Sequence, residues 1–253
     1  MGSPAGSVAA EGGLRVAADR VLRIMGLMAA DGGGGSRRLC EVSAEVTGMS
    51  GAGIMLVDGS GPVGSLCSTD DTSRVIERLQ YTLGEGPCID AHNTGGEVVE
   101  SDLAESGSRR WPAFTRSAVD AGARAVFGFP VRVGVARLGA LNLYRDRPGP
   151  LSDDQRSDAL IMADLAARII LATQSNVAPD GVAAGLDTEA DLHLVVHQAA
   201  GMVSIQLDVS VAEALIRLRA YAFRSGRPIN DVAAAVVKRE LRFSEPPRPE
   251  DRP

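Results

Sequence analysis

A tight hairpin in the middle of the chain limits the folds that the chain can adopt. Residues 124–133 and 136–144 each read as a long apolar strand, and Gly134 and Val135 form the short connection between them. Two strands joined in this way pair antiparallel. The sequence around this hairpin therefore has to supply an antiparallel sheet and elements that cover it.

Helices and further short strands surround the hairpin. The pattern predicts strands at 51–58, 62–69 and 95–101, helices at 14–28, 37–47, 72–80, from Pro112 onward and at 152–172, and a loop at 81–95. Consecutive strands with helices at both ends are typical of an α+β domain, in which helices pack on one antiparallel sheet.

The chain then changes character. Residues 173–187 are rich in Asn, Pro and Gly and are predicted to be a linker, and residues 188–243 carry three amphipathic helices with tight connections. The boundaries we expect are a tail at 1–13, a first domain at 14–172, the linker, an all-α bundle at 188–243 and a tail at 244–253.

Basic charge gathers in the second helix of this bundle, although the chain has a net charge of −6. Residues 217–227 hold four arginines and no acid. On a helical wheel, Arg217, Tyr221 and Arg224 share one stripe beside the apolar face, whereas Arg219 falls on the opposite flank. Guanidinium groups suit phosphate oxygens and tyrosine rings can stack on bases, but such a run can equally be a solvated surface.

The bundle resembles an ANTAR domain. The resemblance rests on these residues of the three helices: Gln198, Ala199, Gly201, Met202, Ser210, Glu213, Ala214, Leu218, Arg219, Ala222, Gly226, Arg227, Val232, Ala233, Val236 and Val237. It implies a module of bacterial transcription antiterminators that binds paired stem-loops in leader RNA, and not specific DNA. The RNA-binding residues that it implies here are Gln198, Gly201, Arg217, Arg219, Tyr221 and Arg224.

Residues 14–172 resemble a GAF domain of the kind found before ANTAR modules in actinobacterial regulators. The resemblance rests on the segments 79–103, 110–114 and 124–145. It implies a sensor that binds a small molecule or a partner and acts on its neighbouring domain. A ligand pocket is expected between the sheet and the loop 82–95, lined by Cys88, Trp111, Phe127 and Phe129, but the same side chains could equally form the core, and no ligand or cofactor can be named.

Three cysteines without a CxxC motif predict no disulfide framework and a reducing cytoplasm. Cys88 is either a redox sensor or a small buried side chain, and Cys67 with Cys88 is the pair that thiol chemistry would need. His193 and His197 lack the HExxH form, so no metal site is expected. The sequence contains no catalytic constellation that would indicate an enzyme. It also contains no apolar run long enough to indicate a membrane span.

Together these features predict a cytoplasmic sensor and RNA-binding antiterminator that is not an enzyme. We expect a homodimer through helices 14–28 and 152–172. The alternative is that the apolar stripes of these helices pack against the sheet instead. The alternatives are a regulator that binds a protein instead of RNA, a redox sensor that uses Cys88, and a small-molecule enzyme such as a sulfoxide reductase.

Overall fold

The computed structural model describes residues 5–30, 35–58, 61–175 and 189–244. Its strands form one antiparallel sheet in the order β2-β1-β5-β4-β3. The strands are β1 (Gly51–Asp58), β2 (Gly61–Ser68), β3 (Val98–Glu100), β4 (Ala125–Val133) and β5 (Ala136–Arg145). The predicted hairpin is confirmed, because Val133 pairs with Ala136 and Gly134 takes the positive φ of 58° that the turn needs.

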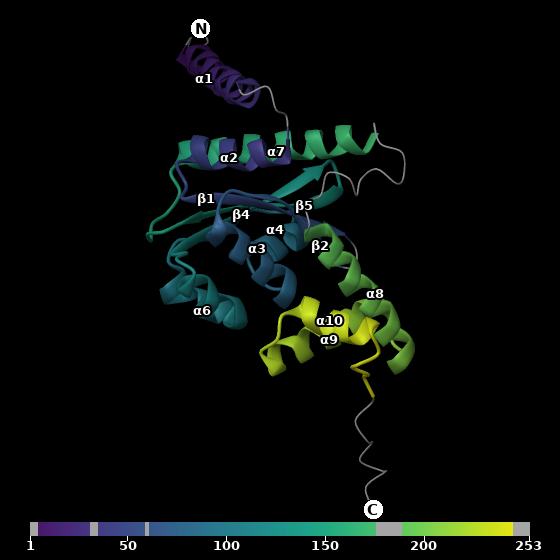
Figure 1. The fold of residues 1–253 in the computed structure, drawn as a ribbon. Coiled ribbons are helices and arrows are strands. Elements are labelled where there is room, and N and C mark those ends of the chain that lie inside the picture. Colours follow the sequence, from purple (N-terminus) through teal and green to yellow (C-terminus); the bar gives the residue numbers. More distant parts are fainter. Residues whose placement is uncertain (1–4, 31–34, 59–60, 176–188, 245–253) are drawn as a thin grey trace, which may run out of the picture.

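Helices cover both faces of the sheet (Figure 1). On one face lie α2 (Ser36–Thr47) and α7 (Asp153–Ser175), with α1 (Ala5–Ala29) outside them; on the other lie α3 (Asp71–Leu83), α4 (Pro87–Thr94) and α6 (Pro112–Asp120). A π-helical turn, η1 (Leu103–Gly107), and a short helix, α5 (Ser108–Arg110), precede α6. The α+β class expected for this half is confirmed.

Helix α1 and the segment 81–95 differ from the expectation. Helix α1 begins at Ala5, within the segment 1–13 that was expected to be a tail. The expected loop 81–95 contains the helix α4, which the Gly-rich flanks concealed: Pro87 occupies its first turn, and Gly95 ends it with a φ of 70°.

The second half is the expected bundle of three helices, α8 (Glu189–Leu207), α9 (Val211–Ser225) and α10 (Ile229–Val237). Helix α7 continues to Ser175, and the rest of the predicted linker lies outside the described residues. Within the described part of the chain, no single helix is long and apolar enough to cross a membrane, although one bent pair, Val195–Leu207 with Val211–Ser225, passes that test of length and composition.

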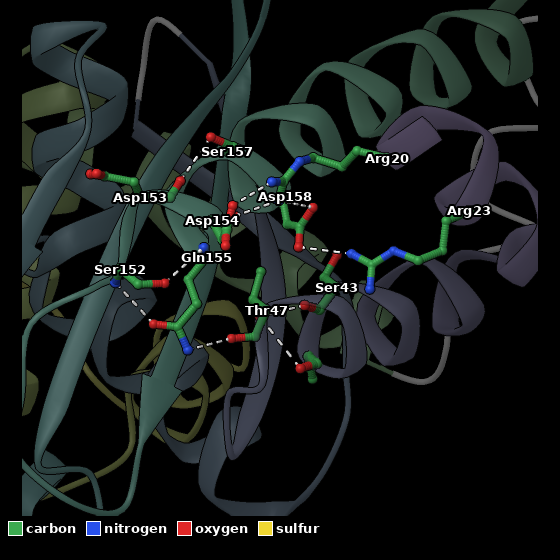
Figure 2. Close-up of polar contacts among 11 residues, drawn as sticks. Arg20, Arg23, Ser43, Thr47, Ser152, Asp153, Asp154, Gln155, Ser157 and Asp158 are labelled. Carbon is green, nitrogen blue, oxygen red and sulfur yellow. Dashed lines mark hydrogen bonds and ion pairs between the residues drawn. The ribbon is translucent and has the colours of Figure 1, made fainter. Parts of the chain in front are cut away.

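Polar contacts fix α1 and α7 beside each other (Figure 2). The buried carboxylate of Asp158 on α7 accepts hydrogen bonds from Arg20 at 2.8 Å and from Arg23 at 2.9 Å. The predicted capping box at the start of α7 is confirmed, with Gln155 N donating to Ser152 Oγ and Ser152 N to Gln155 Oε1. Gln155 also donates from Nε2 to the carbonyl of Thr47, which ties α7 to the end of α2.

A disulfide joins Cys40 on α2 to Cys67 on β2, with 6.1 Å between the two Cα atoms. The expectation that the cysteines form no disulfide, with Cys67 and Cys88 as the plausible pair, is therefore wrong. Cys88 lies on α4, on the other side of the sheet from α2, and its thiol is buried and donates to the carbonyl of Ala140 at 3.4 Å. Sequence spacing alone does not show which elements bring two cysteines together.

Candidate nucleic-acid interface and domain contact

Helix α9 carries the basic stripe, and its ends are well defined. Ser210 Oγ accepts from the backbone N–H of Glu213 at 3.2 Å, and Gly226 ends the helix with a φ of 63°. Its buried side chains face α8 and α10; they are Ala214, Leu215, Leu218 and Ala222. This apolar face fixes the rotation of the helix and therefore decides which arginines reach solvent.

Arg217 and Arg224 are exposed on α9, as the wheel predicts. Arg217 Nη2 contacts Glu213 Oε1 at 2.9 Å, one turn earlier on the same helix. Such exposed pairs contribute only about 0.3–0.5 kcal/mol, so a phosphate can replace the carboxylate at little cost. The guanidinium of Arg224 lies 5.7 Å from the ring centroid of Tyr221, and the two residues therefore form one contact surface.

Tyr221 is less available than a free stacking platform would be. It is half-buried, and its ring centroid lies 5.4 Å from that of Phe243. Phe243 is held in turn by its backbone N–H, which donates to Gln206 Oε1 at 2.9 Å. The aromatic pair thus holds the segment after α10 against the bundle. Sequence reasoning missed this role because Phe243 follows the last predicted apolar position.

Gln198 and Gly201 lie on α8, the first of the three helices. Gln198 is exposed and Gly201 is partly exposed. A Cβ atom at Gly201 would meet no atom within 4 Å outside its own helix. Packing inside the bundle therefore does not require glycine at this position.

Arg219 is not part of this exposed surface. Its Nε and Nη2 atoms are shielded from solvent and make no hydrogen bond among the described residues. The guanidinium lies against Gly84, where Nη1 would be 3.2 Å from an added Cβ, and also approaches Gly61. The structure therefore places Arg219 at the contact between the two domains, away from the expected RNA face.

The position of Arg219 has an electrostatic reason. Gly84 ends α3 in the left-handed conformation with a φ of 67°, and the last turn of α3 contains no basic residue. The carbonyl end of a helix attracts a cation, and Arg219 supplies one from the other domain. Burial lowers the pKa of Arg219, and the neighbouring Tyr81 opposes that effect.

The four side chains expected to line a ligand pocket do not meet in one place. Phe127 and Phe129 point to the face covered by α2 and α7, because alternate strand residues share a face. Cys88 and Trp111 belong to the core on the opposite face. All four are buried in the two cores, so the expected pocket is not formed by them.

A cavity lies instead where the two domains meet. It has a volume of about 250 Å³ and is partly open; β1, β2 and α3 line it on one side, and Pro228 and the first turn of α10 line it on the other. Its lining residues from the first domain include Met55, Glu77 and Tyr81, and those from α10 include Ile229 and Asn230. Sequence reasoning could not find this cavity, since it requires the relative placement of two domains.

No group of three or more potential metal ligands occurs among the residues that the structure describes. The side chain of His193, one half of the histidine pair noted in the sequence, lies outside the described part.

Comparisons with known proteins agree with this two-part architecture. A model of the GAF domain matches residues 36–171, and a model of the ANTAR domain matches residues 184–237. A search of curated proteins gives no match.

Among solved structures, the GAF domain of an Acinetobacter phosphoenolpyruvate-protein phosphotransferase is 13% identical, with a TM-score of 0.49 over 64% of this chain and 96% of its own. The corresponding domain from Coxiella burnetii is 11% identical, with a TM-score of 0.46 over 63% of this chain and 95% of its own. The match of the GAF model covers more than half of the sequence, so the chain belongs to the GAF-domain family, and its GAF domain is followed by an ANTAR domain.

Proposed function

We propose that this protein is a signal-responsive, RNA-binding transcription antiterminator. In this proposal the ANTAR domain binds paired stem-loops in leader RNA and the GAF domain controls it. The observation that carries the proposal is the surface of α9, where Arg217 and Arg224 are exposed beside Tyr221 while the opposite side of the helix is buried. Arginines so placed can neutralise phosphates without disturbing the core of the bundle.

The proposed RNA face consists of Gln198 and Gly201 on α8 and of Arg217, Tyr221 and Arg224 on α9. A glutamine amide can read a base edge in an unpaired loop, and a glycine allows close approach of the backbone. Arg219 is left out because it serves the domain contact.

Control by the GAF domain has a direct route. Residues from both domains form one apolar cluster, in which Tyr81 on α3 belongs together with Leu218 on α9. The guanidinium of Arg219 lies beside Gly84 at the end of α3. A ligand or partner that shifts α3 therefore acts on the helix that carries the basic stripe.

A homodimer is part of the proposal. Leu22 and Met25 on α1 are 67% and 56% exposed, although the helix is anchored to α7 through Arg20 and Arg23. Apolar side chains on an outer helix are available for a second copy. Most of the stripe on α7 is used on the sheet, since Ala163 and Ala167 are buried there.

A second candidate function is a regulator that binds a protein through its ANTAR domain. Ile216 and Phe223, two turns apart on α9, are 61% and 63% exposed. Such exposed apolar side chains can contact a protein partner.

Redox sensing by Cys88 is disfavoured, because complete burial and the nearby Glu77 carboxylate raise the pKa of the thiol. We propose a regulatory role rather than an enzymatic one. We also propose a cytoplasmic location, although the Cys40–Cys67 disulfide argues against it, because disulfides are rare in a reducing cytoplasm.

Crosslinking in cells, followed by sequencing of the RNA that copurifies with the full chain, tests the proposal. We expect leader transcripts with two adjacent hairpins to be enriched, and the enrichment to fall in an Arg217→Ala/Arg224→Ala variant. Recovery of a protein partner with no RNA above the background of the same variant would favour the second candidate and overturn the first.

A further inference from the structure

The cavity between the domains is walled by groups of both charges and by an apolar surface. Met55, Tyr81 and Ile229 supply apolar side chains, all of them deeply buried. Arg74 and Arg78 on α3 supply positive charge, and Glu77 on α3 with Asp231 on α10 supply negative charge. A site of this kind suits a small molecule that carries both charges on an apolar body.

Glu77 is the most constrained of these groups. It is 2% exposed, and one of its carboxylate oxygens accepts from the amide of Asn142 on β5. The carboxylate occupies space that β1 leaves open at Gly53, where an added Cβ would come within 2.6 Å of Glu77 Oε1. A carboxylate has about four acceptor positions, so Glu77 can also accept from a cationic ligand.

The groups opposite Glu77 complete the chemistry. Asn230 on α10 contributes a buried Oδ1 atom that makes no hydrogen bond among the described residues. This atom is a further acceptor for an ammonium group. Arg78 is exposed on α3. Arg74 pairs with Asp71 one turn earlier on the same helix, and an exposed pair of this kind is weak. Both guanidinium groups can therefore turn toward a carboxylate at the mouth of the cavity.

We propose that this cavity binds a small zwitterion of α-amino-acid type, with its ammonium group toward Glu77 and Asn230 and its carboxylate toward Arg74 and Arg78. The volume of about 250 Å³ suits a metabolite smaller than a typical drug. Because α10 provides one wall, the bound molecule contacts both domains and favours their docked arrangement. This coupling rests on the proposed RNA function, whereas the binding site itself does not.

The test is a thermal-shift and calorimetric screen of the full chain against the twenty standard L-amino acids. We expect at least one amino acid to bind saturably. The analogue of that amino acid without its carboxylate, and the analogue without its ammonium group, should not bind. Glu77→Gln and Arg78→Gln should each weaken binding at least tenfold. Arg116→Gln on α6 is the matched control, because Arg116 is exposed on a helix of the same domain and does not line this cavity, and it should bind as the parent does.

Asp231→Asn examines the wall that comes from the ANTAR domain and avoids any folding defect of the Glu77 variant. It should also weaken binding, and its circular dichroism should match that of the parent. The proposal fails if no amino acid binds, or if binding is the same in the Arg78 and Asp231 variants as in the parent. RNA binding, measured separately on the same preparations, distinguishes failure of this site from failure of the proposed antiterminator function.

Discussion

Removal of the Cys40–Cys67 disulfide is predicted to destabilise the GAF domain by a defined amount. The bond closes a loop between residues that are 27 apart in sequence. Loop closure of that length restricts the unfolded chain and stabilises the fold by about 3.5 kcal/mol in the chain-entropy model. The Cys40→Ala/Cys67→Ala variant should lose about this much free energy of unfolding, plus a smaller part from lost packing.

The assay is denaturant unfolding followed by the fluorescence of Trp111. This is the chain's single tryptophan and it is buried in the GAF core, so the signal reports this domain and not the ANTAR bundle. Reductant should lower the midpoint of the parent and leave that of the double variant unchanged. An unaffected parent midpoint, or three reactive thiols in the unfolded and unreduced parent, would refute the reasoning.

Three further predictions concern the domain contact and the buried groups. Arg219→Met keeps most of the side-chain volume. Desolvation of the guanidinium offsets its attraction to the end of α3, so this variant should change the free energy of unfolding by less than about 1 kcal/mol, whereas Arg219→Ala should lose about 2 kcal/mol in chemical denaturation. An equally large loss in both variants would contradict this balance. Burial raises the pKa of Tyr81 to about 12, so its contribution of roughly 2 to 3 kcal/mol is complete below pH 10 and is lost as the pH rises through 12; Tyr81→Phe should flatten the pH dependence of unfolding in this window, and an unchanged curve would contradict the assignment. The Cys88 thiol is buried with a raised pKa, so a thiol reagent at pH 8 should modify it only after unfolding; rapid modification of the native chain would revive the redox hypothesis.

Local sequence patterns predicted most of the elements. The hairpin at Gly134 and the cap at Ser210 were readable because turn and cap chemistry depends on a few neighbouring residues. Helix α4 was not predicted, because Gly86 and Gly95 at its ends are typical of loops, although these glycines act as its caps.

The site was only partly predictable, since a helical wheel shows faces but not what covers them. Arg217 and Arg224 were placed correctly on the exposed surface. The helical wheel separates Arg219 from them, but the family resemblance places Arg219 among the RNA-binding residues, and that prediction is wrong. That Arg219 meets the end of α3 follows from the docking of two domains, and no local pattern encodes it. The expected aromatic pocket failed for a similar reason, because its members lie on opposite faces of the sheet.

The most direct test of the account measures RNA affinity of the full chain against salt concentration, with a two-hairpin leader RNA identified by crosslinking. The parent should lose affinity linearly on a logarithmic scale, because phosphate neutralisation releases counterions. Arg217→Ala/Arg224→Ala should bind more weakly and reduce the slope by about 1.4 to 1.8, the value for two lost phosphate contacts. Arg219→Met, from the buried side of the same helix, should keep the parent's slope. Equal affinity and slope in the double variant and the parent would contradict the assignment of RNA binding to this face of α9.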